Sequence, residues 1–242
     1  YEIYCAQGEF EVKCLHDYHG IAERNIVRLG SLWFRRLEEA SRQNRVESVS
    51  VCRTILYAGV AEPYFPRSYE IRLLAELRER LDSFGLNEIR LIYRPYIGPS
   101  EDESLVSRTI ANKLLAIRDV ELQQPDYSQN SVEATGDLKA LGIDVGVRNY
   151  VGEICIADLI ICSHTTTIAW DAAFLGRYVI GNFIDYDGVL NRRGTSLRFN
   201  AEGVLDCWPE FPVARTLDEL TELVLSVLES DIHLKALKGS LN

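Results

Sequence analysis

The chain has 242 residues, of which 47% are hydrophobic and 26% are charged, and this balance is ordinary for a globular protein. It excludes the collagen-like and the intrinsically disordered classes. The formal net charge of −10 at pH 7 argues against a general nucleic-acid binder, which would show a basic face or stripe.

The first 50 residues predict a small α/β unit followed by a helix. Apolar runs at 3–5 and 26–29 indicate strands, and residues 9–18 between them favour a helix. One βαβ unit cannot cover a sheet by itself, so we expect residues 1–31 to be the end of an incomplete amino-terminal α/β domain. Residues 32–50 carry an amphipathic pattern and are expected to form a connector helix.

Residues 51–230 predict a larger α/β domain, with residues 231–242 as a carboxyl-terminal tail. Apolar runs alternate with amphipathic segments, which is typical of a parallel sheet with helices on both faces. The expected fold class is therefore α/β with a Rossmann-like parallel sheet, preceded by the tail of a second α/β domain. Strands are expected at 54–58, 89–93, 159–162, 178–180 and 203–205 and once within 120–136; helices are expected at 69–84, 101–119, 151–157, 168–175 and 217–229, with a helical turn at 137–141.

Sequence signatures of several common enzyme classes are absent. The chain has no G-x-x-x-x-G-K-[ST], no G-x-G-x-x-G after a strand, no G-x-S-x-G and no H-E-x-x-H. This argues against a P-loop ATPase, a dinucleotide dehydrogenase, an α/β-type serine hydrolase and a zinc protease. The six cysteines form no C-x-x-C pair, which favours buried thiols over disulfides or a metal site. We expect neither a metal nor a cofactor.

The distribution of apolar residues favours a cytoplasmic location. No apolar run approaches the ~18 residues that a membrane span needs. The amino terminus also lacks the charged-then-apolar pattern of a signal peptide.

The most informative segment is residues 157–180, which combine a strand, a polar turn, a helix and a second strand. The turn lies at the carboxyl end of a strand, where open α/β sheets bind ligands. Unpaired N–H groups at the start of the helix favour an anion such as a phosphate. Routine helix capping by Ser and Thr is the alternative interpretation. The candidate residues of this turn are Ser163, His164, Thr165, Thr166 and Thr167.

Four charged residues outside the turn are candidates for the same site. Arg94 ends a strand before a proline, and its guanidinium suits bidentate recognition of phosphate, with a salt bridge as the alternative. Asp171 lies in an otherwise apolar helix and is a candidate to accept hydrogen bonds from sugar hydroxyls. An exposed helical acid or an intrahelical hydrogen bond to Thr167 are its alternatives. Arg192 and Arg193 lie in a glycine-containing loop that either closes over the site or forms a solvated turn.

The central segment resembles part of the carboxyl-terminal domain of GT-B glycosyltransferases. The run A-D-L-I-I-C-S at 157–163, followed by T-T-T, D-A-A, L-G-R and V-I, is similar to the "aDlvis…sTt…Ea…lGkPvi" segment of that domain. Three shorter runs fit the same family. I-L-Y-A-G at 55–59 looks like the opening strand of the domain, and N-I-V-R-L-G-S at 25–31 like the close of the amino-terminal domain. L-I-Y-R-P at 91–95 looks like the "yRPHP" segment of enzymes that build bacterial surface polysaccharides and teichoic-acid-like polymers, of the CDP-glycerol glycerophosphotransferase kind.

The chain departs from the family pattern at three positions. Tyr96 stands in place of the histidine after Arg94-Pro95, Asp171 in place of the usual glutamate, and Tyr178 in place of a proline. The first departure puts a histidine contact to the substrate in doubt. The shorter carboxylate of Asp171 can still reach a hydroxyl.

The resemblance implies a metal-independent glycosyl- or polyol-phosphate transferase that uses a nucleotide-activated donor to build a surface polysaccharide. Arg94 and the turn at 163–167 would hold the donor phosphate and Asp171 a hydroxyl, while the catalytic base stays unidentified. The implied partners are the nucleotide-linked donor and a glycan or lipid-linked acceptor, with no nucleic acid. Peripheral association with the inner face of the membrane, through regions outside this chain, is a further implication. The alternatives are a nucleotide-sugar epimerase of the same architecture and a non-catalytic binding module.

Overall fold

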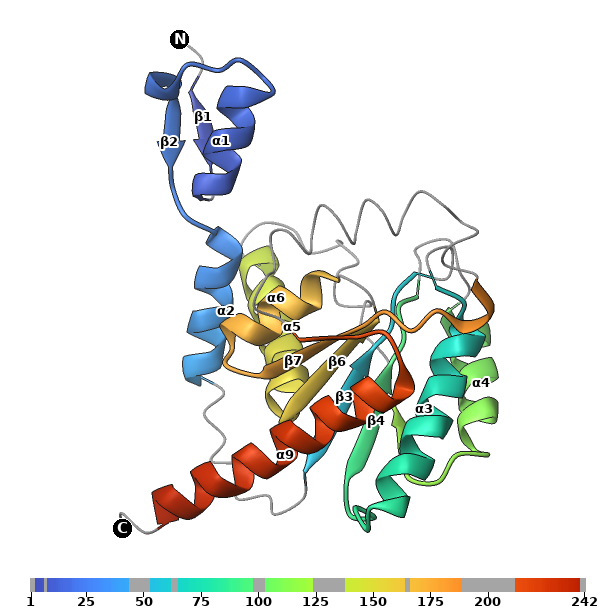
Figure 1. Ribbon diagram of the computed structural model, residues 1–242. Coiled ribbons are helices and arrows are strands. Elements are labelled where there is room, and N and C mark those ends of the chain that lie inside the picture. Colours follow the sequence, from blue (N-terminus) through green and yellow to red (C-terminus); the bar gives the residue numbers. More distant parts are fainter. Residues whose placement is uncertain are drawn as a thin grey trace.

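The computed structural model shows a small α/β unit and a larger α/β part joined through helix α2 (Figure 1). The structure describes residues 3–6, 8–43, 53–61, 65–97, 103–123, 138–163, 166–188 and 212–239.

The small unit is the βαβ arrangement that the sequence predicts. Strands β1 (Tyr4–Ala6) and β2 (Ile26–Arg28) pair in parallel, with α1 (Glu9–Asp17) and the short helix η1 (Glu23–Asn25) between them. These strands form a two-stranded sheet of their own, which stands apart from the large sheet in Figure 1.

Helix α2 (Leu32–Gln43) packs on the large part of the molecule. Leu37 and Ala40 are buried against Val147 and Val151 of a later helix. The apolar side of the amphipathic pattern at 32–43 is therefore buried against this neighbouring helix. The predicted boundaries of the domains stay predictions.

The large part is built on a six-stranded parallel sheet, which confirms the expected fold class. Its order is β5-β4-β3-β6-β7-β8, and every neighbouring pair is parallel. The order reverses between β3 and β6, the topological switch point at which doubly wound sheets bind ligands. The strands are β3 (Thr54–Ala58), β4 (Arg90–Arg94), β5 (Val120–Leu122), β6 (Leu159–Ser163), β7 (Tyr178–Asn182) and β8 (Val213–Ala214).

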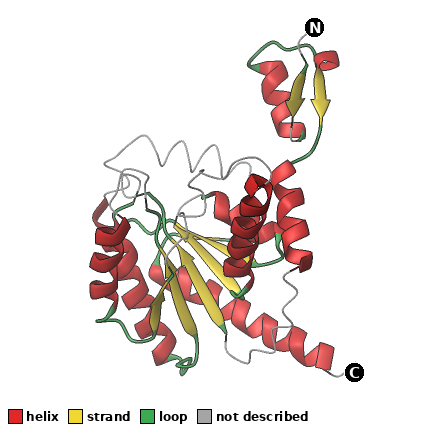
Figure 2. Ribbon diagram, turned by 180° about the vertical axis from the view of Figure 1, so that it is seen from behind, coloured by secondary structure: helices red, strands yellow, loops and turns green. Residues whose placement is uncertain are grey.

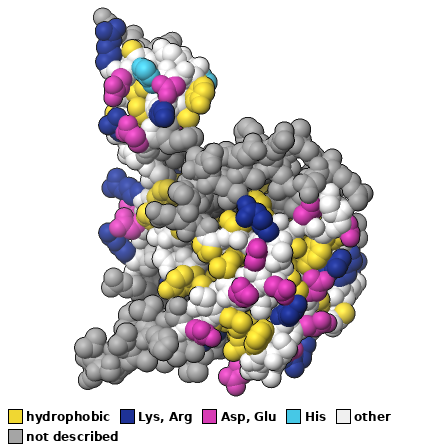
Figure 3. Space-filling view, viewed as in Figure 1, with side chains coloured by type: hydrophobic (Ala, Val, Ile, Leu, Met, Phe, Trp, Pro, Cys, Tyr) yellow, Lys and Arg dark blue, Asp and Glu magenta, His cyan; other side chains and the backbone are white. Residues whose placement is uncertain are grey.

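Helices cover both faces of this sheet (Figure 1, Figure 2). One face packs on α3 (Arg67–Ser83), α4 (Glu103–Leu114) and α9 (Leu217–Gly239), because alternate strand residues such as Tyr57, Tyr93 and Ile161 lie in a core with the leucines of α3. The other face, with Leu56, Ile92 and Cys162, packs on α5 (Leu138–Cys155) and α6 (Thr167–Phe174). On the side of the molecule in Figure 3, the acidic and basic side chains of the described residues are interspersed.

Several local predictions need correction. The helical turn expected at 137–141 and the helix expected at 151–157 are parts of one helix, α5. The helix expected at 69–84 begins two residues earlier, at Arg67, with Pro66 as its N-cap, and ends at Ser83. The strand expected at 203–205 lies outside the described residues, whereas a strand that was not expected, β8, adds the last strand to the sheet.

The thiol prediction holds only in part, because among the described cysteines all are free but only Cys162 is fully buried and Cys5 is exposed. No helix within the described part of the chain is long and apolar enough to cross a membrane.

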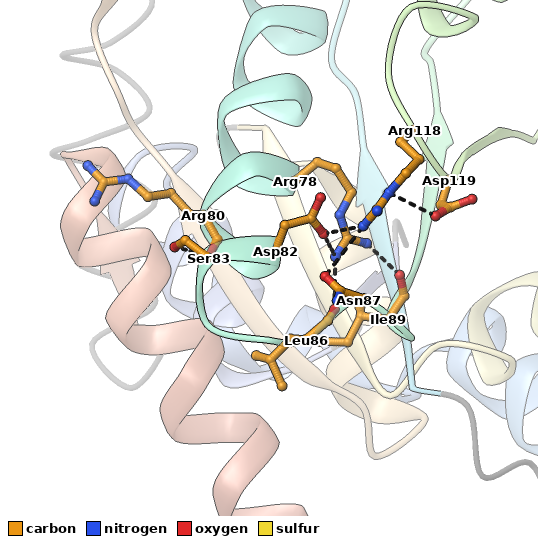
Figure 4. A network of polar contacts seen from close by, with 9 residues as sticks. All are labelled: Arg78, Arg80, Asp82, Ser83, Leu86, Asn87, Ile89, Arg118 and Asp119. Atoms are coloured by element: carbon orange, nitrogen blue, oxygen red, sulfur yellow. Dashed lines mark hydrogen bonds and ion pairs between the residues drawn. The ribbon is translucent and has the colours of Figure 1, made fainter.

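A buried arginine in α3, Arg78, binds the segment that leads into β4 (Figure 4). Arg78 donates hydrogen bonds to the carbonyl oxygens of Ile89 at 2.7 Å and Leu86 at 2.8 Å and pairs with Asp82 at 2.6 Å. Arg118 contacts the same Asp82 oxygen at 2.7 Å. This network joins the end of α3 to the beginning of β4, at the edge of the sheet opposite the candidate site.

Candidate functional site

Polar side chains gather where the strands on either side of the switch point end. Ala58 at the end of β3 lies opposite both Arg94 of β4 and Cys162 of β6, and Ser163 lies opposite Asn182 of β7. Because parallel strands end at the same edge of a sheet, these residues share the edge at which α/β proteins bind ligands.

At the start of helix α6, two hydroxyl groups have no hydrogen-bond partner in the part of the chain that the structure describes. Thr166 is the N-cap residue and has an extended backbone (φ −111°, ψ 154°), yet its side chain makes no capping hydrogen bond. Among the described residues, neither its Oγ1 nor the Oγ of fully buried Ser163 has a hydrogen-bond partner. Buried polar atoms in native proteins are almost always satisfied, so a ligand is a candidate partner for these two hydroxyls. Thr167, the first residue of α6, is exposed.

Two of the predicted residues, Arg94 and Asp171, meet through Tyr150 of helix α5. The Arg94 guanidinium lies 5.6 Å from the centre of the Tyr150 ring, and Arg94 Nε contacts Glu153 Oε2 at 3.1 Å. The Tyr150 hydroxyl donates to Asp171 Oδ2 at 2.6 Å. The salt-bridge alternative for Arg94 is therefore realised, while its guanidinium also takes part in a cation–π contact.

The Asp171 carboxylate is held from two sides. Besides Tyr150, the indole of Trp33 in α2 donates to its Oδ1 at 2.8 Å. The alternative of an exposed helical acid is wrong, because Asp171 is only 5% exposed. Burial raises the pKa of Asp171, and the hydrogen bonds from Tyr150 and Trp33 work in the opposite direction.

A second polar cluster lies on the other face of the sheet, around Glu70 in the first turn of α3. Glu70 is 1% exposed and accepts hydrogen bonds from the Tyr93 hydroxyl at 2.5 Å and from the Val60 backbone N–H at 2.9 Å. Nearby, Asn182 donates to the Tyr57 hydroxyl at 3.1 Å. Glu70 thus bridges the turn after β3 and strand β4.

The pKa of Glu70 is raised to about 7, above all by burial. The hydrogen bonds from the Tyr93 hydroxyl and the Val60 N–H and the charge of Arg67 each lower this pKa.

The structure divides the predicted site between the two faces of the sheet. Side chains alternate along a strand, so Arg94 points with Ile92 toward α5, and Ser163 points with Ile161 toward α3. Arg94 and Asp171 come together through Tyr150, and Ser163 lies on the other face of the sheet. The remaining candidates, His164, Thr165, Arg192 and Arg193, lie outside the described residues. Within the described part of the chain, no cluster of His, Cys, Asp and Glu could hold a metal ion.

The sequence interpretation missed Glu70, Tyr150 and Trp33. Glu70 has an ordinary explanation as an acid in the first turn of a helix, where it complements the helix dipole. The sequence signal that could have indicated Glu70 is its position in the first turn of the helix that follows β3 and Gly59. Tyr150 and Trp33 carry no local signal, because their shared partner Asp171 is distant in sequence.

Comparison with known proteins establishes the fold. No protein-family model and no curated protein sequence matches the chain. A putative UDP-N-acetylglucosamine 2-epimerase from Listeria monocytogenes is similar in structure, with 16% identity, a TM-score of 0.58, and coverage of 94% of this chain and 51% of that chain. UDP-GlcNAc 2-epimerase from Methanocaldococcus jannaschii is also similar in structure, with 14% identity and a TM-score of 0.52. The match covers 94% of this chain and 54% of the epimerase chain.

The wall teichoic acid polymerase TagF also matches, with 15% identity and a TM-score of 0.46. The match covers 93% of this chain and 48% of the TagF chain. The chain spans about half the length of these solved structures. The large part of the chain has the GT-B Rossmann-like fold that the sequence resemblance implies.

Proposed function

We propose that the carboxyl edge of the large sheet binds a nucleotide-activated substrate and that the chain is the substrate-binding half of a GT-B glycosyl- or polyol-phosphate transferase. The observation that carries this proposal is the pair of buried hydroxyls, Ser163 and Thr166, that lack partners among the described residues at the start of α6. They stand at the switch point of the sheet, beside the unpaired N–H groups of a helix start, where a phosphate is favoured.

The proposed site uses charge and hydrogen bonding and no metal. The helix start and Arg94 hold the phosphates and stabilise the negative charge that develops on the departing nucleotide. Asp171 accepts a hydrogen bond from a hydroxyl of the transferred group, since each of its oxygens keeps a lone pair beyond the hydrogen bonds from Trp33 and Tyr150. The proposed binding residues are Arg94, Ser163, His164, Thr165, Thr166, Thr167, Asp171, Arg192 and Arg193.

The named ligands of one structural neighbour support the ligand class. The Methanocaldococcus jannaschii epimerase has been solved with UDP-GlcNAc and UDP. A nucleotide-linked sugar or polyol is the corresponding substrate for this chain, and a surface glycan or a lipid-linked glycan is the proposed acceptor. We assign no catalytic base. A bacterial enzyme of polysaccharide synthesis at the cytoplasmic face of the membrane is the setting that fits this chemistry.

A nucleotide-sugar epimerase is the second candidate, because the two reported neighbours with the higher TM-scores are named as UDP-GlcNAc 2-epimerases. The two functions differ in whether they need an acceptor. An epimerase inverts carbon 2 of UDP-GlcNAc without an acceptor, which proton NMR detects directly. A transferase leaves that centre unchanged and consumes its substrate only when an acceptor is present. Binding without either reaction would favour a non-catalytic module.

Calorimetric titration with a panel of CDP-, CMP-, UDP- and GDP-linked sugars and with CDP-glycerol tests the proposal. We expect at least one of them to bind, and Ser163→Ala and Arg94→Gln each to weaken binding by about tenfold or more. Ser83→Ala is the matched control, because Ser83 is exposed at the opposite end of α3. Absence of binding across the panel, or equal losses in Ser83→Ala, would overturn the proposal.

A further inference from the structure

The indole of Trp33 is exposed and yet held in one orientation. Trp33 is 40% exposed, although its N–H donates to the buried carboxylate of Asp171 at 2.8 Å. Its ring also contacts Tyr150, with 5.9 Å between the ring centres and 46° between the ring planes. These two contacts orient the indole before any ligand binds, and a preorganised side chain loses little conformational entropy when it becomes part of a binding surface.

A ligand hydroxyl that bonds Asp171 Oδ1 also comes close to Trp33. The indole N–H already bonds Oδ1, and the Tyr150 hydroxyl bonds Oδ2. A second donor on Oδ1 would lie about 4.5–5 Å from the indole nitrogen, because each donor stands about 2.8 Å from the shared oxygen. The carbon atoms next to that ligand hydroxyl are then within van der Waals reach of the indole.

The order of the groups on this face of the sheet matches the order of the parts of a nucleotide-linked sugar. Arg94, which is proposed to bind phosphate, and Trp33 both contact the ring of Tyr150, and the Arg94 guanidinium lies 5.6 Å from the ring centre. Asp171 follows the N-cap residue Thr166 by about 7 Å along the axis of α6. A group attached to a phosphate at the start of α6 is therefore within reach of Asp171 and Trp33.

A flat apolar ring with a hydrogen-bond acceptor at its edge is complementary to a sugar ring. A sugar ring presents C–H groups on its faces and hydroxyls around its rim, so one face can pack on the indole while a hydroxyl donates to Asp171. Glycerol has hydroxyls but no ring face. We propose, on the basis of the proposed function, that Trp33 is a specificity-determining residue that packs against the group carried by the nucleotide, and that this group is a sugar ring rather than a polyol.

Calorimetric titration with nucleotide-linked probes and the matching bare nucleotides tests this assignment. The pairs are UDP-GlcNAc with UDP, GDP-mannose with GDP, and CDP-glycerol with CDP. We expect a sugar-linked probe to bind and Trp33→Leu to weaken its binding about tenfold, whereas the affinity for the bare nucleotide changes less than about twofold. Phe84→Leu is the matched control. Phe84 is an exposed aromatic residue at the far end of α3, at the opposite edge of the sheet, so both affinities should stay unchanged.

A fluorescence measurement covers the case in which Trp33→Leu does not fold. Trp170→Phe combined with Trp208→Phe leaves Trp33 as the one tryptophan of the chain. Excitation at the long-wavelength edge of the indole absorption avoids absorption by the nucleotide. We expect the emission of Trp33 to change when the sugar-linked probe binds and to stay constant when the bare nucleotide binds. An equal response to both overturns the assignment.

The outcomes separate this inference from the proposed function. Unchanged binding of the sugar-linked probe in Trp33→Leu, or equal losses for the probe and its bare nucleotide, overturns the role of Trp33 and leaves the nucleotide site standing. Binding of CDP-glycerol or of bare nucleotides alone, or a loss for CDP-glycerol as large as for the sugar-linked probe, overturns the choice of a sugar ring. Absence of binding by every probe, bare nucleotides included, overturns both.

Discussion

The indole N–H of Trp33 donates a 2.8 Å hydrogen bond to Asp171, a residue 138 positions later in the chain. Trp33 lies in α2, which follows the small amino-terminal unit, and Asp171 lies one turn into α6, whose start is the proposed phosphate site. Because Asp171 also binds Tyr150, and Tyr150 contacts Arg94, the helix that joins the two parts of the chain is linked to the edge of the sheet.

We expect Trp33→Phe to destabilise the protein by about 1–2 kcal/mol, because it leaves a buried carboxylate with one hydrogen bond fewer. Tyr150→Phe should have a similar effect through the other oxygen. Urea unfolding of both single variants and the double variant measures whether the two bonds are coupled. Strictly additive losses would show that Trp33 and Tyr150 do not act on a shared partner.

Gly59→Ala should destabilise the chain by about 1–3 kcal/mol, because the new methyl group meets a carboxylate oxygen packed on the backbone. Gly146→Ala is the matched control. Its methyl group meets nothing within 4 Å, and it lies inside helix α5, where alanine is favoured over glycine by up to about 1 kcal/mol. Melting temperatures should therefore move in opposite directions for the two variants. If Gly59→Ala is as stable as the wild type, the Glu70 side chain can move away from the new methyl group.

The raised pKa of Glu70 predicts a pH dependence of stability without any ligand. The folded pKa of about 7 lies above the reference value of 4.5, so between these values the folded chain holds a proton that the unfolded chain has lost. This contribution is fully present below pH 4.5 and disappears as the pH rises through 7. The wild type should lose up to about 3 kcal/mol over this window from Glu70. Denaturant unfolding at pH 5 and pH 8 should show a smaller difference for Glu70→Gln than for wild type.

Arg78→Met should cost about 3 kcal/mol, because removal of the buried guanidinium takes away its hydrogen bonds to the carbonyl oxygens of Ile89 and Leu86 and one of the two ion pairs of Asp82 (Figure 4). Arg80→Met provides the comparison on the same helix. Arg80 forms an exposed pair with Asp218, for which less than about 1 kcal/mol is expected. Equal losses in the two variants, measured by urea unfolding, would contradict a special role for Arg78.

The sequence predicts most of the large sheet because its inner strands carry strong local signals. Strands β3, β4, β6 and β7 are short apolar runs, and their alternation with helices specifies a parallel arrangement. Helix α5 was predicted as two pieces because Gly142 and Gly146 lower the helix propensity of its first half. Strand β8 has two residues and no periodicity to detect.

The sequence predicts the location of the candidate site at the start of α6, but not which side chains meet there. Ser163 and the start of α6 follow from the order strand, turn, helix. The meeting of Arg94 with Asp171 depends on Tyr150, and the burial of Glu70 depends on how α3 sits on the strand ends; both are tertiary contacts with no local pattern. The roles of Arg94 and Asp171 in binding stay predictions.

The placement of Arg94 and Ser163 has a consequence for the length of the ligand. Arg94 of β4 and Cys162 of β6, the residue before Ser163, both lie opposite Ala58 of β3. Their backbones are therefore two strand spacings apart, which is about 10 Å. The side chains of Arg94 and Ser163 also leave the sheet on opposite faces. A molecule that touches both must lie across the strand ends, over β3. Inorganic phosphate is too short to do so, whereas a diphosphate with a group at each end has the required span.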